Sequence, residues 1–86
     1  MRMAIRPIDT LTPRERSVLL HMMHGLSAEQ IASEEYVTVC TVRSHIRSIL
    51  FKLRVNSQLA AVSYANKLLW PSEEEYVQAF TVVAAS

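Results

Sequence analysis

The segment Thr38 to Arg54, TVCTVRSHIRSILFKLR, decides the fold of this chain. Placed on a helix at about 100° per residue, its aliphatic residues form one stripe and its arginines another, about a quarter-turn or more away. The aliphatic stripe consists of Val42, Ile46, Ile49 and Leu53, and the basic stripe of Arg43, Arg47 and Arg54. We expect a helix over about residues 39–54, with Thr38 as its N-cap, that buries the first stripe and exposes the second.

The residues before this segment predict two shorter helices. Thr12, Pro13 and Glu15 supply a hydroxyl N-cap, a proline at the first helical position and an acid that can reach back to the cap amide. This helix should run to about His24 and end at Gly25, because glycine adopts the left-handed conformation of a helix C-terminus most easily.

The second helix begins at Ser27, with Gln30 completing a capping box, and ends near Glu35. Only Tyr36 and Val37 separate it from the N-cap Thr38. Two helices joined by so short a turn should cross at a steep angle.

A fourth helix is expected over about residues 58–70, capped by Ser57 or Asn56 and stopped by Pro71. It is apolar on two sides, so one side can pack on the core while the other is left for a partner, most simply a second copy of the chain. Candidate dimer-interface residues are Leu59, Val62, Tyr64, Leu68 and Leu69.

These helices make one domain over residues 11–70, preceded by an N-terminal arm over residues 1–10 that is either extended or a frayed start. Residues 71–86 form an acidic and apolar tail in which Ser72 and the three glutamates after it are typical of a helix start, so a fifth helix is a candidate there. The tail could also fold over the basic stripe and inhibit it.

Composition agrees with a single small all-α domain. The chain has 86 residues, of which 50% are hydrophobic and 20% charged, with one glycine and three prolines, too few for many tight β-hairpins. A single cysteine, Cys40, excludes an intramolecular disulfide and a multi-cysteine zinc site. No apolar run approaches the ~18–20 residues that span a bilayer, and no signal peptide is recognisable, so we expect a cytoplasmic location without a membrane partner.

The charges are segregated along the chain although the net charge is only +1. No Asp or Glu occurs from residue 36 to residue 72, whereas five Lys and Arg do. The partner of this stretch should therefore be anionic.

Catalytic and metal-binding patterns were not found in the sequence. It has no paired carboxylates, no Ser-His-Asp set and no phosphate-binding glycine loop, and its three histidines lack the spacing of metal ligands. We expect no enzyme activity, catalytic residue, metal, cofactor or small-molecule ligand.

Several short motifs occur in a specific order: LTPRER at 11–16, GLS at 25–27, IA at 31–32, TVRSHI at 41–46, KLRV at 52–55 and AV at 61–62. Together they closely resemble the LuxR-type (GerE-like) helix-turn-helix domain of bacterial regulators, over about residues 11–69. The resemblance implies a four-helix DNA-binding domain of a transcription regulator, with the third helix in the major groove and the fourth in dimer contacts.

The resemblance also implies residue roles. Arg43, Ser44 and Arg47 match positions that meet base edges, while Thr41 and Lys52 match positions that touch the DNA backbone. We add three backbone candidates: Arg54 on the basic stripe, and Ser27 and Thr38, where the amides of a helix start attract phosphate.

The sequence departs from the family pattern at three places, each of which removes a phosphate contact or adds an acid: Ala28-Glu29, Ser48 and Gln58.

Our main hypothesis is a sequence-specific double-stranded DNA-binding regulator acting as a homodimer. The alternative is a helical protein-interaction module that binds another regulatory protein and not DNA. The region-four domain of sigma factors opens similarly, but Ser44-His45 and the capped fourth helix argue against it.

Overall fold

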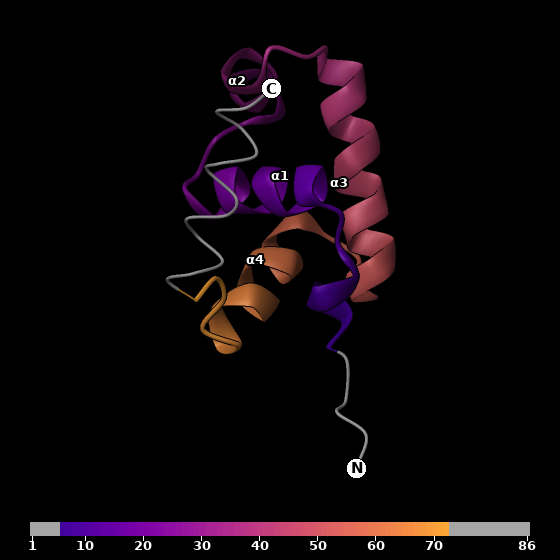
Figure 1. The fold of residues 1–86 in the computed structure, drawn as a ribbon, viewed down its shortest axis with the longest axis vertical. Coiled ribbons are helices and arrows are strands. Elements are labelled where there is room, and N and C mark those ends of the chain that lie inside the picture. Colours follow the sequence, from indigo (N-terminus) through magenta and orange to yellow (C-terminus); the bar gives the residue numbers. More distant parts are fainter. Residues whose placement is uncertain (1–5, 73–86) are drawn as a thin grey trace.

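A computed structural model of the chain describes residues 6–72, which fold into four α-helices preceded by a short 3-10 helix (Figure 1). The elements are η1 (Pro7–Thr10), α1 (Pro13–Met23), α2 (Ala28–Glu35), α3 (Val39–Leu53) and α4 (Gln58–Lys67). Every regular element within residues 6–72 is helical, so the predicted all-α fold is confirmed.

The predicted helix starts are confirmed by their hydrogen bonds. In α1, Thr12 Oγ1 accepts from the Glu15 amide at 3.1 Å, and Glu15 Oε1 accepts from the Thr12 amide at 2.9 Å. Ser27 and Gln30 repeat this reciprocal capping at α2 with distances of 3.1 and 2.7 Å. Thr38 caps α3 by accepting from the Thr41 amide at 3.1 Å. Each cap satisfies amides that the first helical turn leaves unpaired.

The core lies where α1, α2 and α4 pack against the inner side of α3. Figure 1 shows α3 along the long axis of the molecule, α1 crossing it, and α2 seen nearly end-on above α1. The predicted steep crossing of α2 and α3 is therefore confirmed. All four residues of the aliphatic stripe of α3 are at most 5% exposed, as the sequence predicts. They belong to one buried cluster that also includes Val18, Leu19, Met22, Ile31, Ala61 and Ala65.

The expected N-terminal arm over residues 1–10 differs from the structure in its second half. Residues 7–10 form η1, and Ile8 within it is fully buried, while Leu11 directly after it is 3% exposed. Two aliphatic side chains in the core hold this segment against α3. Residues 1–5 lie outside the described part of the chain.

The end of α4 also differs from the prediction, because the helix stops at Lys67 and Pro71 does not terminate it. Leu69 adopts a left-handed conformation with φ of 55°, and the Trp70 amide donates back to Ala65 O at 3.0 Å. This turn brings the Trp70 side chain into the core, where it is 3% exposed. The expected fifth helix falls on residues outside the described range.

Candidate nucleic-acid interface

The outer side of α3 is a polar and basic surface. Thr41, Arg43, Ser44 and Arg47 are all exposed, although they share a helix with the buried aliphatic stripe. Arg54 follows at the left-handed C-cap, with φ of 57°, and is exposed too. The 15-residue helix is about 22 Å long, and the diameter of an α-helix fits the width of the major groove.

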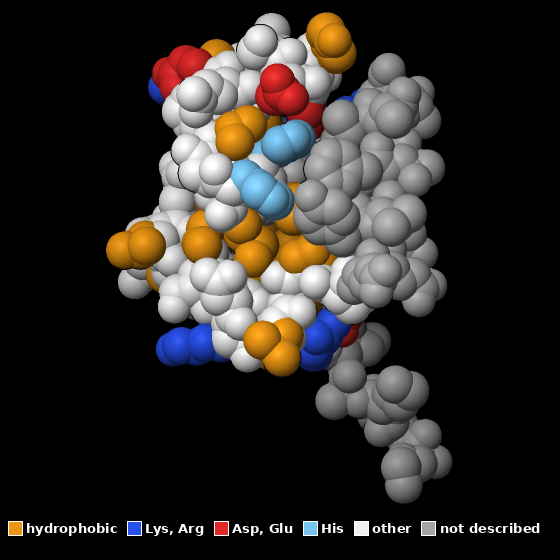
Figure 2. All heavy atoms as spheres, turned by 90° about the vertical axis from the view of Figure 1, so that its left-hand side faces the viewer, with side chains coloured by type: hydrophobic (Ala, Val, Ile, Leu, Met, Phe, Trp, Pro, Cys, Tyr) orange, Lys and Arg blue, Asp and Glu red, His pale blue; other side chains and the backbone are white. Residues whose placement is uncertain are grey.

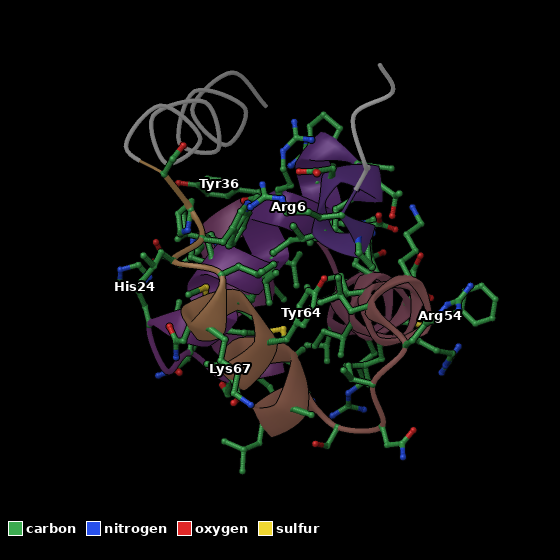
Figure 3. The ribbon with its side chains drawn as sticks, turned by 90° about the horizontal axis from the view of Figure 1, so that it is seen from below. Arg6, His24, Tyr36, Arg54, Tyr64 and Lys67 are labelled. Carbon is green, nitrogen blue, oxygen red and sulfur yellow. The ribbon has the colours of Figure 1, made fainter. Side chains whose placement is uncertain are left out.

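Two side chains at the lower end of the molecule, Arg54 and Tyr64, point in different directions. Figure 3 shows Arg54 pointing outward from the end of α3, whereas Tyr64 points from α4 toward the centre of the bundle. The predicted DNA-facing residue therefore lies on solvent, and one predicted dimer-interface residue points inward.

Arg43 and Arg47 differ in their surroundings. The Arg43 guanidinium lies 3.3 Å from a carboxylate oxygen of Glu29 in the first turn of α2, and both side chains are about two-thirds exposed, at 63% and 66%. Arg47 makes no ion pair with any residue between 6 and 72. Its guanidinium is therefore the more available of the two for an external anion.

Lys52 lies at the edge of this surface but is held by the fold. Its Nζ donates to Glu15 Oε1 at 2.7 Å, and the two side chains are 29% and 6% exposed. Ser48 donates to the other oxygen of Glu15 at 2.6 Å. Glu15 therefore caps α1 and ties α1 to two successive turns of α3. The departure Ser48 has a structural role in this contact.

Burial would raise the pKa of Glu15, because it disfavours the charged carboxylate. The hydrogen bonds from Lys52, Ser48 and the Thr12 amide outweigh this effect, as they stabilise the ionised form, and the pKa is lowered to about 2. Glu15 is thus a carboxylate at neutral pH, and it neutralises the ammonium group of Lys52.

A second buried carboxylate, Glu35, joins α2 to α1. Its Oε2 accepts from Ser17 Oγ at 2.6 Å and lies 3.0 Å from His21 Nδ1, and Arg14 is 4.0 Å from its other oxygen. Burial would raise the pKa of Glu35, but the hydrogen bonds from His21 and Ser17 prevail and lower it. This cluster fixes α2 in place, and α2 in turn carries Glu29 beside Arg43.

The residues that begin α2 and α3 are accessible. Ser27, Thr38 and Thr41 are exposed, and the Thr38 and Thr41 hydroxyls lie 2.9 Å apart at the start of α3. Thr38 and Thr41 belong to the first turn of the helix that carries Arg43 and Arg47. A phosphate there would meet amides and hydroxyls together.

The five predicted dimer-interface residues differ in their exposure. Leu59 and Leu69 are 79% and 85% exposed, whereas Val62, Tyr64 and Leu68 pack partly against the core. The core-facing side of α4 is made by Ala61 and Ala65, which are fully buried. Only the outer residues of α4 remain available to a partner.

The side turned away from α3 has a different character. Figure 2 shows acidic side chains toward the α2 end of this face, basic side chains toward the α4 end, and hydrophobic and histidine side chains between them.

Residues 6–72 contain no group of three or more His, Cys, Asp or Glu that could hold a metal ion. None of the described helices is long and apolar enough to cross a bilayer.

Two features of the site are not predicted from the sequence. The Glu15–Lys52 contact joins residues that are 37 positions apart and share no local motif. Phe51 is 83% exposed on α3 and belongs to neither predicted stripe. The helical projection that separated the two stripes could have found Phe51, since it places this aromatic ring away from the aliphatic stripe.

Comparisons with known proteins place these features in context. A family model described as bacterial regulatory proteins, luxR family, matches residues 9–65. A nitrate/nitrite response regulator protein homolog of Haemophilus influenzae is 47% identical over 55 residues, which cover 64% of this chain and 26% of that protein. The response regulator protein VraR of Staphylococcus aureus is 42% identical over 57 residues, covering 66% and 27%. The chain therefore matches about a quarter of the length of these relatives.

Proposed function

The chain belongs to the luxR family of bacterial regulatory proteins, and from this premise we propose that it binds double-stranded DNA sequence-specifically to regulate transcription. In this proposal α3 enters the major groove and two copies of the chain bind a two-fold site with half-sites about 10 bp apart. In this proposal the chain binds chromosomal DNA in the cytoplasm.

One observation carries the proposal: α3 exposes a basic stripe while its aliphatic stripe is sealed in the core. The arrangement leaves a rigid rod with cations on its free side, as groove reading requires. Arg47 supports it most directly because no acid within the described residues pairs with its guanidinium.

The roles follow from the side-chain chemistry. Arg43 and Arg47 can each donate two parallel hydrogen bonds to guanine O6 and N7, and the exposed Ser44 hydroxyl can contact a neighbouring base edge. Thr41, Ser27, Thr38 and Arg54 are exposed, and in this proposal they contact phosphates of the DNA backbone. Lys52 stands at its edge, and its phosphate attraction is weakened by Glu15.

The homodimer is proposed through the outer side of α4. Leu59 is 79% exposed on this helix, and burying such a side chain against its symmetry mate would be favourable. Leu59→Asp should lower the oligomeric state in sedimentation equilibrium and weaken binding to a two-half-site duplex more than to a single half-site. Equal weakening on both duplexes would place the dimer contact elsewhere.

The test of DNA reading starts with selection of duplexes from a random library by the 86-residue chain. Arg47→Ala should lose about 1–3 kcal/mol of discrimination at one base pair of the selected site while it still binds non-specific DNA at low salt. Arg16→Ala, on α1, is the matched control and should leave the preference unchanged. An unchanged preference in the Arg47 variant would refute its assigned role.

Cys40 offers an independent test of the docking of α3. It is an exposed free thiol one turn before Ser44. Selected duplex DNA should slow the alkylation of Cys40, whereas single mononucleotides should not. Alkylation at the same rate with saturating DNA would exclude α3 from the groove.

The competing function is a protein-interaction module that binds another regulatory protein. The Glu29–Arg43 pair favours it, because it opposes DNA binding by one of the two proposed reading arginines. Gel shifts decide between the two functions: absence of any shift at about 50 mM salt would favour the module, since phosphate attraction should be visible there.

A further inference from the structure

Phe51 is the one large apolar side chain of α3 that the fold leaves in solvent, with 83% of its surface exposed. The other exposed large apolar residues among residues 6–72 lie on other elements: Tyr36 after α2, Leu59 on α4 and Leu69 after α4. Phe51 is thus not part of an apolar stripe that continues along the helix.

The position of Phe51 ties it to the basic stripe. It stands four residues after Arg47 and three before Arg54, the spacing at which helical side chains lie on one face. A shallow surface hollow beside it is lined by Leu50 and Val55 and by the charged residues Lys52 and Arg54. Lys52 is paired with Glu15, so Arg54 in the hollow and Arg47 one turn earlier on the helix are the cations on this face without an acidic partner among residues 6–72.

These surroundings decide what the ring can contact. A purely apolar protein surface would have to desolvate the two arginines without pairing them, which is unfavourable. The major groove offers phosphates and acceptor atoms to the arginines and, at every thymine, a 5-methyl group to the ring. The neighbours of Phe51 therefore favour duplex DNA over an apolar protein partner.

We propose that Phe51 is a specificity-determining residue that reads thymine through its 5-methyl group. This inference rests on the proposed DNA-binding function and adds an apolar contact to the guanine contacts of the arginines. Four residues of helix rise about 6 Å, a little under two base-pair steps of about 3.4 Å. The thymine should therefore lie about two base pairs from the base that Arg47 reads.

The experiment removes the methyl group from the DNA and the ring from the protein. Each thymine of the selected duplex is replaced in turn by deoxyuridine, which keeps the base-pair hydrogen bonds, and binding to the wild-type chain is measured by fluorescence anisotropy. One replacement in each half-site should weaken binding about fourfold, as expected for one buried methyl group. Adding a methyl group by 5-methylcytosine at a cytosine in that position should strengthen binding.

Variants assign the effect to the ring. In Phe51→Ala the thymine and deoxyuridine duplexes should bind equally, and in Phe51→Leu most of the discrimination should remain. Arg47→Ala should lose its guanine preference and keep the thymine discrimination. Thermal unfolding of the Phe51 variants should match the wild type, because the ring is exposed.

Four results would overturn the inference. If the wild type binds no duplex at about 50 mM salt, the proposed function fails and the inference fails with it. If it binds but does not distinguish thymine from deoxyuridine at any position, or if Phe51→Ala keeps the distinction, only the inference fails. If Phe51→Ala instead weakens all duplexes equally and lowers the oligomeric state, the ring belongs to a protein contact.

Discussion

Two ion pairs join α3 to the helices before it, and they differ mainly in burial. Glu15 and Lys52 join α1 to α3 at 2.7 Å with side chains 6% and 29% exposed. Glu29 and Arg43 join α2 to α3 at 3.3 Å with side chains 66% and 63% exposed. Each pair combines one carboxylate with one cation of α3.

The difference in burial gives the two pairs different roles. The buried pair has further hydrogen bonds from Ser48 and the Thr12 amide, so breaking it would leave a poorly hydrated charge. The exposed pair is screened by water and contributes about 0–1 kcal/mol to stability. The buried pair Glu15–Lys52, called the inner pair below, therefore holds α3 in position. The exposed pair Glu29–Arg43, called the outer pair below, can be exchanged for contacts to DNA.

The largest expected effect is the pH dependence of the unfolding free energy that Glu15 of the inner pair produces. Because the pKa of Glu15 in the folded protein, about 2, lies below its usual value of 4.5, its stabilisation is complete above about pH 4.5 and is lost as the pH falls toward 2. The shift corresponds to about 3 kcal/mol of unfolding free energy. Urea titrations across this range should show the loss, and Glu15→Gln should flatten the curve. Glu35 contributes in the same direction and remains in both proteins.

At neutral pH, Glu15→Gln should lower the unfolding free energy by about 2–3 kcal/mol. The side-chain oxygen of Gln can still accept from the Thr12 amide, so the helix cap is kept, but the charge opposite Lys52 is lost and an NH2 group replaces the oxygen that accepts from Ser48. Glu29→Gln is the matched control and should change stability by less than about 0.5 kcal/mol. Equal stability of the two variants would contradict the assignment of the structural role to the inner pair.

The contrast also shows which parts of the molecule local sequence can predict. The caps Thr12, Ser27 and Thr38 were predictable because their partners lie three residues away. Glu15 was recognised as a capping acid, but its contact with Lys52 depends on how α1 crosses α3. No local pattern encodes that crossing.

The same limit explains the other differences. Ile8 precedes any helical repeat, so its burial is visible only once η1 packs against α3. Pro71 predicts a helix end because proline breaks helices, yet α4 ends earlier because the turn at Leu69 places Trp70 in the core. Burial of Glu35 was hidden because its partners, Ser17 and His21, come from another helix.

A smaller effect should appear in the salt dependence of DNA binding. Arg54→Asn, which suits the left-handed C-cap, should reduce the slope of log K against log salt concentration by about 0.9, as expected for one lost phosphate contact. Lys52→Gln should reduce it by less, because Glu15 already neutralises Lys52. Fluorescence anisotropy from 50 to 200 mM salt measures both slopes. A larger change for Lys52 would mean that DNA displaces Glu15 from it.

The smallest expected effect concerns the outer pair itself. Glu29→Gln removes a carboxylate beside the proposed interface and releases the Arg43 guanidinium, so every duplex should bind about two- to fivefold more tightly at 50 mM salt. The gain should shrink at 200 mM salt, because exposed charges are then screened more strongly. Arg43→Gln in the Glu29→Gln background tells whether the gain acts through Arg43 or through general repulsion. If Glu29→Gln instead weakens only the selected sequence, Glu29 orients Arg43 for reading, and the outer pair would then be part of the recognition surface.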